Sequence, residues 1–267
     1  TNVTGLTSAQ GTNRWLVGTN DSAGNVNSSR VTFSVDSLVP QVSFGAVTAA
    51  NASIVSRSWV YVNISASDAN EQAVTFALSN ASTLINQTIF SAGTRTINWT
   101  SLADGTYYYN VSVNDSLGNT NWTETRTITL DTGIPSGFYV APTEESGVSR
   151  ARSFIEINVT GLDVHLDSIV VRVYNSTHVL INQSTSQTSS FYLNVGGLTN
   201  GIYYYNASVN DSASNLFELS TRNITLDTTY PLISLLYPLN MTYTNVQTAL
   251  NYIVIDVNAQ ACWYSTD

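Results

Sequence analysis

The stretch DGTYYYNVSVND, residues 104–115, alternates apolar and polar side chains with a period of two. Tyr107, Tyr109, Val111 and Val113 fall on one side of an extended chain, and the residues between them, mostly polar, fall on the other. A half-buried β-strand gives this pattern, whereas a helix does not. We therefore expect a strand whose tyrosine and valine side faces a core.

This dozen residues recurs, which indicates that the chain is built of repeats. NGIYYYNASVND occupies residues 200–211, and a fainter copy, GTNRWLVGTND, occupies residues 11–21. Corresponding residues such as Asp36, Asp131 and Asp227 are about 95 positions apart. The spacing divides the chain into the C-terminal half of a module (1–40), two complete modules (41–135 and 136–231) and the N-terminal half of another (232–267).

The two partial modules leave two arrangements open. In one, the chain is a stretch of a longer array of modules. In the other, the partial modules at the two ends complete one another between neighbouring molecules. We favour the first, because joining the last residue to the first would omit a strand that the complete modules possess.

Each complete module contains about seven short alternating segments separated by turn-rich stretches, and no segment shows good helical periodicity. Examples are WVYVNIS at 59–65 and TRTITL at 125–130. A glycine precedes the aromatic strand at a fixed distance in every copy, at Gly11, Gly105 and Gly201, which predicts a tight turn with positive φ. The sequence thus predicts an all-β fold of tandem antiparallel β-sandwiches.

The run L-x-x-G-x-Y-x-Y-x-V-x-V-x-D-x-x-G-N resembles a strand and turn of bacterial and archaeal Ig-like modules, relatives of the fibronectin type III sandwich. In the first complete module its residues are Leu102, Gly105, Tyr107, Tyr109, Val111, Val113, Asp115, Gly118 and Asn119. The second module departs at Ser214, which replaces the turn glycine. The resemblance covers nearly the whole chain and implies tandem Ig-like modules of large glycosylated cell-surface or extracellular filament proteins.

The resemblance specifies the fold better than the function, because such modules serve as stalks, adhesins, surface-layer parts and enzyme spacers. It also implies that Tyr107 and Tyr203 are corner tyrosines, whose hydroxyls bond the backbone upstream. The alternative is that both are ordinary core tyrosines.

Composition excludes several classes of function. Only 10% of the residues are charged, all nine cations are arginines, and the net charge of −9 argues against binding nucleic acid. The single cysteine, Cys262, excludes an internal disulfide framework and a cysteine-based zinc site, and we expect it to be buried on a strand. No run of 18 apolar residues exists, so we expect no membrane span within this segment.

Uncharged polar residues replace the missing charges, and many of them form Asn-x-Ser/Thr triplets, the acceptors of N-glycosylation. The triplet asparagines are Asn2, Asn20, Asn27, Asn51, Asn63, Asn80, Asn86, Asn98, Asn110, Asn114, Asn121, Asn158, Asn175, Asn182, Asn206, Asn210, Asn223 and Asn240. With 68 serines and threonines and 28 asparagines, chance placement would give about 7 triplets. Strand alternation raises that expectation to about 14, since polar residues then recur at every second position.

Two observations favour real attachment sites over a merely asparagine- and threonine-rich surface. Six triplet asparagines fall in expected loops or turns: Asn20, Asn27, Asn51, Asn80, Asn121 and Asn240. Eight others fall on expected strands and point outward: Asn63, Asn98, Asn110, Asn114, Asn158, Asn206, Asn210 and Asn223. Glycans would also protect edge strands that contain no lysine to prevent edge-to-edge pairing.

Catalytic and metal sites have weaker support. Asp163, His165 and Asp167 alternate onto one side of an expected extended segment, but a solvated loop explains them better than a metal site. His178 has no counterpart in the other module, and no nucleophile motif accompanies either histidine. We therefore expect no enzyme activity.

Recurring aspartates raise the question of calcium at the module junctions. The set comprises Asp21, Asp36, Asp115, Asp131, Asp211 and Asp227. Because no closely spaced acidic ladder is present and such aspartates ordinarily form turns, we expect no cofactor, with junction calcium as a weakly supported alternative. Outward aromatics could also form a binding stripe, namely Tyr61, Tyr108, Trp122 and Tyr204, although scattered exposed aromatics usually serve cross-strand packing.

The combined interpretation is a structural protein outside the cell or on its surface. It predicts a repeat-built, N-glycosylated stalk or filament whose partners are copies of itself and its covalent glycans. The alternatives are an adhesin, a carbohydrate- or partner-binding surface protein, and spacer modules of a large extracellular enzyme.

Overall fold

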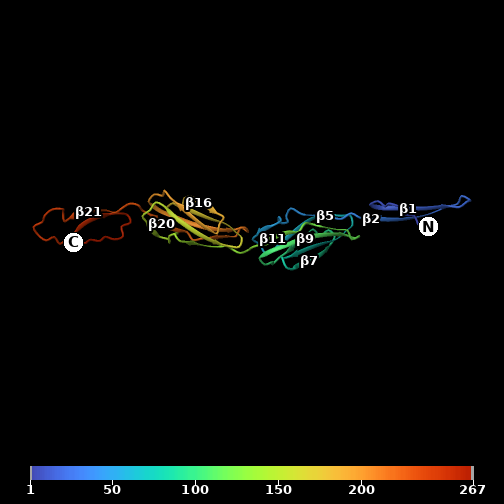
Figure 1. Ribbon diagram of the computed structural model, residues 1–267, viewed down its shortest axis with the longest axis horizontal. Helices are drawn as coiled ribbons and strands as arrows, with labels where there is room; N and C mark the ends of the chain where they lie inside the picture. The colour runs from blue at the N-terminus through green and yellow to red at the C-terminus, as the bar shows by residue number, and fades with distance from the viewer. Residues whose placement is uncertain (1, 266–267) are drawn as a thin grey trace. The chain divides into compact units, whose positions relative to one another are not determined.

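Strands joined by turns make up the whole of the computed structural model, which describes residues 2–265 (Figure 1). Within this range there is no helix, and so none that is long and apolar enough to cross a membrane. The all-β prediction is confirmed. The chain divides into two units, one up to Gly133 and one from Ile134 onward, and each is described by itself.

The first unit contains a two-stranded hairpin followed by a sandwich of two sheets (Figure 1). Its strands are β1 (Gly11–Asn20), β2 (Val26–Val35), β3 (Gln41–Phe44), β4 (Ser53–Val55), β5 (Val60–Ser67), β6 (Glu71–Ser79), β7 (Leu84–Ser91), β8 (Thr96–Trp99), β9 (Gly105–Asp115), β10 (Thr120–Trp122) and β11 (Arg126–Leu130). One sheet has the order β3-β5-β8, and the other has the order β4-β11-β9-β6-β7 with β10 paired to β9.

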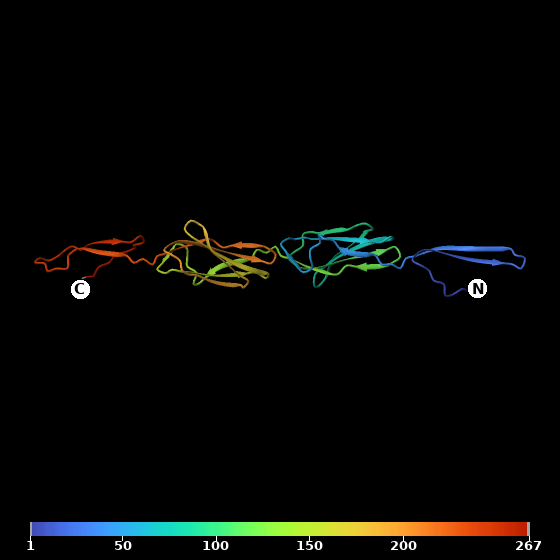
Figure 2. The ribbon, with the colours of Figure 1, turned by 90° about the horizontal axis from the view of Figure 1, so that it is seen from above.

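The second unit repeats this sandwich and ends in a hairpin (Figure 2). Its strands are β12 (Ser136–Val140), β13 (Val148–Arg150), β14 (Ile155–Leu162), β15 (Leu166–Tyr174), β16 (Leu180–Ser186), β17 (Ser190–Val195), β18 (Gly201–Asp211), β19 (Leu216–Glu218), β20 (Arg222–Leu226), β21 (Leu232–Tyr237) and β22 (Asn251–Ile255). The sheet orders are β12-β14-β17 and β13-β20-β18-β15-β16, with β19 paired to β18. Strand for strand, this is the order of the first sandwich.

Each sandwich has nine strand segments, more than the seven or so that the pattern predicted. The first strand of each module is split, because the chain leaves one sheet and joins the other: β3 is antiparallel to β5, whereas β4 is parallel to β11. At this crossover the hydroxyl of Thr48 takes the place of a neighbouring strand as the hydrogen-bond partner of the Asn63 backbone. It donates to the carbonyl of Asn63 at 2.7 Å and accepts from the N–H of Asn63 at 2.8 Å. Thr143 and Asn158 repeat the arrangement. The last strand is likewise interrupted, between β10 and β11 and between β19 and β20.

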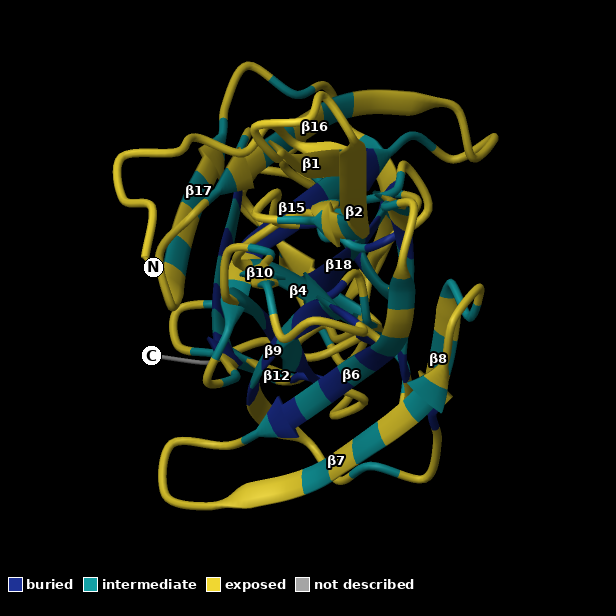
Figure 3. Cartoon of the chain, turned by 90° about the vertical axis from the view of Figure 1, so that its right-hand side faces the viewer, coloured by how far each residue is buried: buried dark blue, intermediate teal, exposed yellow. Residues whose placement is uncertain are grey.

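Core packing follows the alternation of the strands, as the burial colours along β6 show (Figure 3). On β9, Tyr107 and Tyr109 are 7% and 1% exposed, and Val111 and Val113 are fully buried. The equivalent residues of β18 lie in the core of the second sandwich. Burying one such aliphatic or aromatic side chain contributes about 1.5–3 kcal/mol, and each module has its own cluster of them.

Turns at both ends of β9 and β18 depend on a left-handed backbone. Gly105 and Gly201, the first residues of the two strands, have φ values of +144° and +152°, and the sequence predicted their positive sign. After the strands, Gly118 has φ +91°, and Ser214 occupies the same region with φ +72°. The turn is fixed by Asp115, whose carboxylate accepts from the backbone N–H groups of Leu117 and Asn119 and from the Asn119 side chain at 2.7–2.9 Å.

Candidate functional site

The eighteen triplet asparagines all lie at the surface of the part of the chain that is described, and none is buried. Seven are exposed: Asn2, Asn20, Asn27, Asn51, Asn80, Asn98 and Asn240. Eleven are half-buried: Asn63, Asn86, Asn110, Asn114, Asn121, Asn158, Asn175, Asn182, Asn206, Asn210 and Asn223. Each complete module thus presents its asparagines on its outer surface, and those on strands lie opposite the core side chains.

The prediction of which triplet asparagines lie in loops and which lie on strands was partly wrong. Asn27 lies within β2 and Asn121 within β10, and Asn20 is the last residue of β1. Asn51, Asn80 and Asn240 do lie outside the strands. The error for Asn121 arises because β10 is a three-residue strand, too short to produce an alternating pattern.

In several triplets the side-chain oxygen of asparagine is held by the protein. The Oδ1 atoms of Asn86, Asn175 and Asn182 each accept from the hydroxyl of their own triplet, at 2.8, 2.9 and 3.1 Å. The Oδ1 of Asn80 accepts from the backbone of the following turn. No described residue accepts a hydrogen bond from Nδ2 of these four side chains, so the atom to which an N-linked sugar is joined is unengaged.

In two triplets the serine is buried. Ser112, which follows Asn110, is 7% exposed, and Ser208, which follows Asn206, is 1% exposed. Both point away from the core, but they lie where a short strand pairs alongside: Ser112 opposite Trp122, and Ser208 opposite a residue of β19. The Oγ of Ser208 also accepts from Nη1 of an arginine on β15 at 3.1 Å.

The recurring aspartates act as turn formers. The Oδ1 atoms of Asp36, Asp131 and Asp227 each accept from the backbone N–H two residues later, at 3.2, 3.1 and 2.9 Å. The side chain of Asp211 accepts from Asn215, as Asp115 does from Asn119. These bonds account for the recurrence of the aspartates through turn geometry.

One acidic cluster forms within the first unit. Asp36, Asp68 and Asp115 each place a carboxylate oxygen within 4.8 Å of the others. The Asn70 side chain donates to Asp36 at 2.6 Å and holds the pKa of that carboxyl below its usual value. Hydrogen bonds led by that of Asn119 likewise lower the pKa of Asp115. Amide donors therefore already stabilise the charged form of two of the three carboxylates.

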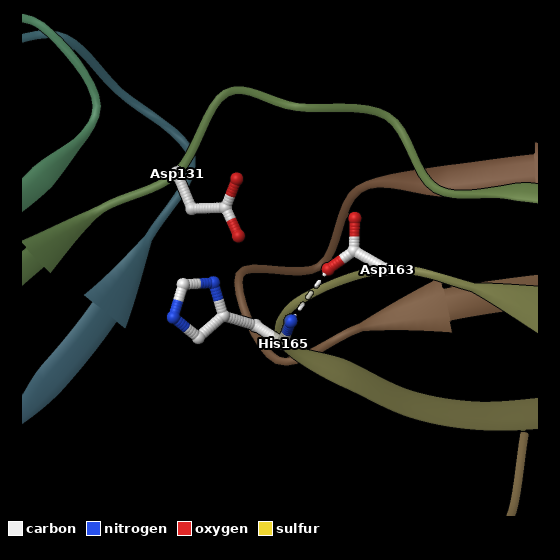
Figure 4. A group of neighbouring side chains, drawn as sticks. All are labelled: Asp131, Asp163 and His165. Atoms are coloured by element: carbon white, nitrogen blue, oxygen red, sulfur yellow. Dashed lines mark hydrogen bonds between the residues drawn. The ribbon is translucent and has the colours of Figure 1, made fainter.

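His165 lies in a turn, in agreement with the loop that the sequence favoured, whereas Cys262 does not lie where it was predicted. The chain turns at Val164 and His165 rather than running extended, and ligand atoms of Asp163 and His165 lie within 4.8 Å of one another. The backbone N–H of His165 donates to Oδ1 of Asp163 at 2.7 Å (Figure 4). Cys262 is exposed, because it follows β22 in the terminal hairpin segment and is not part of a sandwich core.

The outward aromatic residues do not form one stripe. Tyr61 lies on β5 in the three-stranded sheet, whereas Tyr108 and Trp122 lie on the other sheet of the same module. Trp122 is 56% exposed. Tyr204 has a distinct neighbour that the sequence did not predict, the ring of His178, which stacks on it with centroids 4.3 Å apart.

The two corner tyrosines are the most specific fold marker. The hydroxyl of Tyr107 donates to the carbonyl of Ala103 at 2.8 Å, and that of Tyr203 donates to the carbonyl of Thr199 at 2.9 Å. In both modules the acceptor lies four residues upstream, as in the tyrosine corner of Ig-like sandwiches.

No family model and no curated protein matches the sequence. Solved structures similar to the chain include the fibronectin(III)-like modules of Clostridium thermocellum CbhA, at 13% identity over 70% of this chain and 94% of that one, with a TM-score of 0.40. The FN1–FN3 domains of chicken CNTN1 match at 12% identity over 80% and 77% of the two chains, with a TM-score of 0.38. Domains from titin match at 11% identity over 79% and 72%, with a TM-score of 0.41.

The two sandwiches have the fold of tandem Ig-like modules. In each Ig-like module a second buried tyrosine binds the segment that crosses from one sheet to the other. Tyr109 donates to the carbonyl of Ala49 at 3.1 Å, and Tyr205 donates to that of Glu144 at 2.7 Å. An arginine from the last strand donates to the same carbonyl in each module. The Ig-like modules are therefore fixed at the crossover by the same three-part contact.

Proposed function

We propose that this chain is a segment of a structural extracellular protein, a repeat-built and N-glycosylated stalk or filament. The observation on which the proposal rests is the placement of eighteen triplet asparagines at exposed or half-buried positions of both modules and both terminal hairpins. Along β9 and β18, which contain four of these asparagines, the apolar side lies in the two cores. One side of each of these two strands thus builds the module, and the other offers attachment points for sugar.

Few charges remain to hydrate such a surface without sugar. Of the nine arginines, four lie over aromatic rings, namely Arg57, Arg126, Arg152 and Arg222, with guanidinium carbons 3.8–4.6 Å from the ring centroids. A guanidinium in this position packs on the apolar face of the ring while its charge faces water. Glycan hydroxyls would supply the hydration that ionised side chains provide on other proteins.

Glycans would also protect the edges of the sheets. β7 and β16 are the outermost strands of the two five-stranded orders, and they have exposed apolar residues such as Ile89 at 67% and Leu180 at 46%. An exposed, apolar edge without lysine is a template for pairing with another chain. Asn86 and Asn182 lie on these strands, so that a glycan at either position would block such pairing sterically.

The proposal assigns no catalysis to this segment. Its partners are copies of itself within the stalk or filament, and its place is outside the cell or on its surface. Repeating modules would then provide length, and the glycans would provide solubility.

Glycopeptide mass spectrometry of the chain made in an N-glycosylating host tests the proposal. We expect glycans at Asn86 and Asn182 and at most other triplet positions. Asn194, an exposed asparagine on β17 that begins no triplet, is the matched control and should be unmodified. Unmodified asparagine at nearly all eighteen positions would refute the proposal and leave a plain β-stalk.

A further inference from the structure

The outer face of the second module contains a hollow of about 530 Å³. It lies where the last strand is interrupted between β19 and β20, so part of the face of β18 is uncovered. Its walls include Tyr174, His178, Tyr204, Asn206 and Asn223. Two of these are triplet asparagines and three are aromatic.

Differences in sequence between the two modules explain why the second module has this aromatic hollow. Five residues, 175–179, connect the paired residues Tyr174 and Leu180, whereas four residues, 80–83, connect Ser79 and Leu84 in the first module. In the longer loop His178 adopts φ +60°, and its ring stacks on Tyr204 with an interplanar angle of 28°. Tyr174 stands opposite Tyr204 in the register, where the first module has a serine. The hollow thus has an aromatic wall that its counterpart lacks.

Asn206 lies at this wall in an unusual state. Its Oδ1 atom is buried and has no hydrogen-bond partner. Its Nδ2 donates to no described residue, whereas Nδ2 of its counterpart Asn110 donates to Oγ1 of Thr125 at 3.0 Å. Tyr204 lies two residues earlier on the same strand face, so a group joined to Nδ2 of Asn206 begins beside the aromatic wall.

We propose that the hollow binds a saccharide ring, namely the first sugar linked to Asn206, a proposal that rests on the N-glycosylation proposed above. The C–H groups of a pyranose form an apolar face that packs against aromatic rings, here Tyr174 and the Tyr204–His178 pair. The volume falls within the range of about 300–1,000 Å³ that is usual for small-ligand pockets. A free sugar from another molecule would offer the same chemistry.

The rate at which peptide N-glycanase releases each glycan from the folded, full-length glycoprotein tests the proposal. We expect release at Asn206 to be about fivefold slower than at Asn110, the factor that a ring-stacking contact of ordinary strength provides. Tyr174→Ser, which restores the residue of the first module, should make the two rates equal without altering release at Asn110. Equal rates in the unsubstituted protein, with both sites glycosylated, would overturn the proposal.

A second arm distinguishes the two sources of sugar. If glycopeptides show Asn206 unmodified, the proposed glycosylation fails at that site, but the hollow can still be tested. The unglycosylated full chain is then titrated with N,N′-diacetylchitobiose while the NMR signals of the Tyr204 and His178 rings are followed. Saturable shifts of these signals would show that the hollow takes sugar from elsewhere. Their absence, together with unmodified Asn206, would overturn the inference.

Discussion

The turn after β18 offers the sharpest test of how the modules are built. Ser214 has φ +72°, in the region that Gly24 and Gly118 occupy in the other two copies of the turn. A residue with a Cβ atom in the left-handed region costs about 1–2 kcal/mol. Ser214→Gly removes that cost. It also makes the unfolded chain more flexible, and this gain in conformational entropy lowers the free energy of unfolding by about 0.4–1 kcal/mol. We therefore expect the second module to become about 0.5–1 kcal/mol more stable.

The reverse substitution in the first module should have the opposite sign. A Cβ atom at Gly118 would meet nothing within 4 Å, so Gly118→Ser changes only the backbone energy and not the packing. Its expected cost is again about 0.5–1 kcal/mol, which corresponds to a shift of roughly 2–8 °C in the melting temperature of a domain of this size.

Differential scanning calorimetry measures both shifts, and native-state hydrogen exchange assigns each to its module. The hydrogen bond from the backbone N–H of Ser214 to the carbonyl of Asp211, at 3.2 Å, involves no side chain and should survive the substitution. If the two substitutions shift their modules in the same direction, or if Ser214→Gly lowers stability, the left-handed strain is not what distinguishes the two turns.

Tyr205→Phe removes a buried hydroxyl and leaves its carbonyl acceptor with one donor fewer, so urea unfolding should show a loss of about 1–2 kcal/mol; no loss would contradict the bond. Arg95 holds the pKa of Glu71 below its ordinary 4.5 through a hydrogen bond, so the stability this provides is present above that pH and is lost as the pH falls through the lowered value. Glu71→Gln should flatten this acid limb in pH-dependent melting, and an unchanged profile would count against the pair. Gly161→Ala would place a Cβ atom 2.9 Å from the Val209 side chain, so calorimetry should show a loss of about 1–3 kcal/mol; a neutral result would mean that the two sheets can separate there.

The parts of the fold that depend on local pattern could be predicted from the sequence. Alternation along residues 104–115 identified the buried side of β9, because the pleat has a period of two wherever a strand lies. Gly105 and Gly201 signalled left-handed turns for a similarly local reason. The repeat then extended each conclusion to the second module.

Features that depend on the neighbours of a strand could not be predicted in this way. Ser112 was expected to face solvent, yet it is covered because β10 pairs beside it. The splitting of the first strand follows from its change of sheet, which no single-strand pattern records. The sequence does contain one sign of the hollow beside Tyr204, an extra residue between Tyr174 and the LINQS segment. The aromatic wall could not be predicted from it, because the wall depends on the stacking of His178 on Tyr204.

The burial of Ser208 has a consequence for the order in which the chain folds and is modified. An enzyme that recognises an Asn-x-Ser/Thr triplet must reach both the amide and the hydroxyl, and in the folded module Ser208 is only 1% exposed. On the glycosylation proposed above, sugar would be added at Asn206 before β19 pairs with β18. Biosynthetic timing, rather than the finished surface, would then decide whether this position is modified.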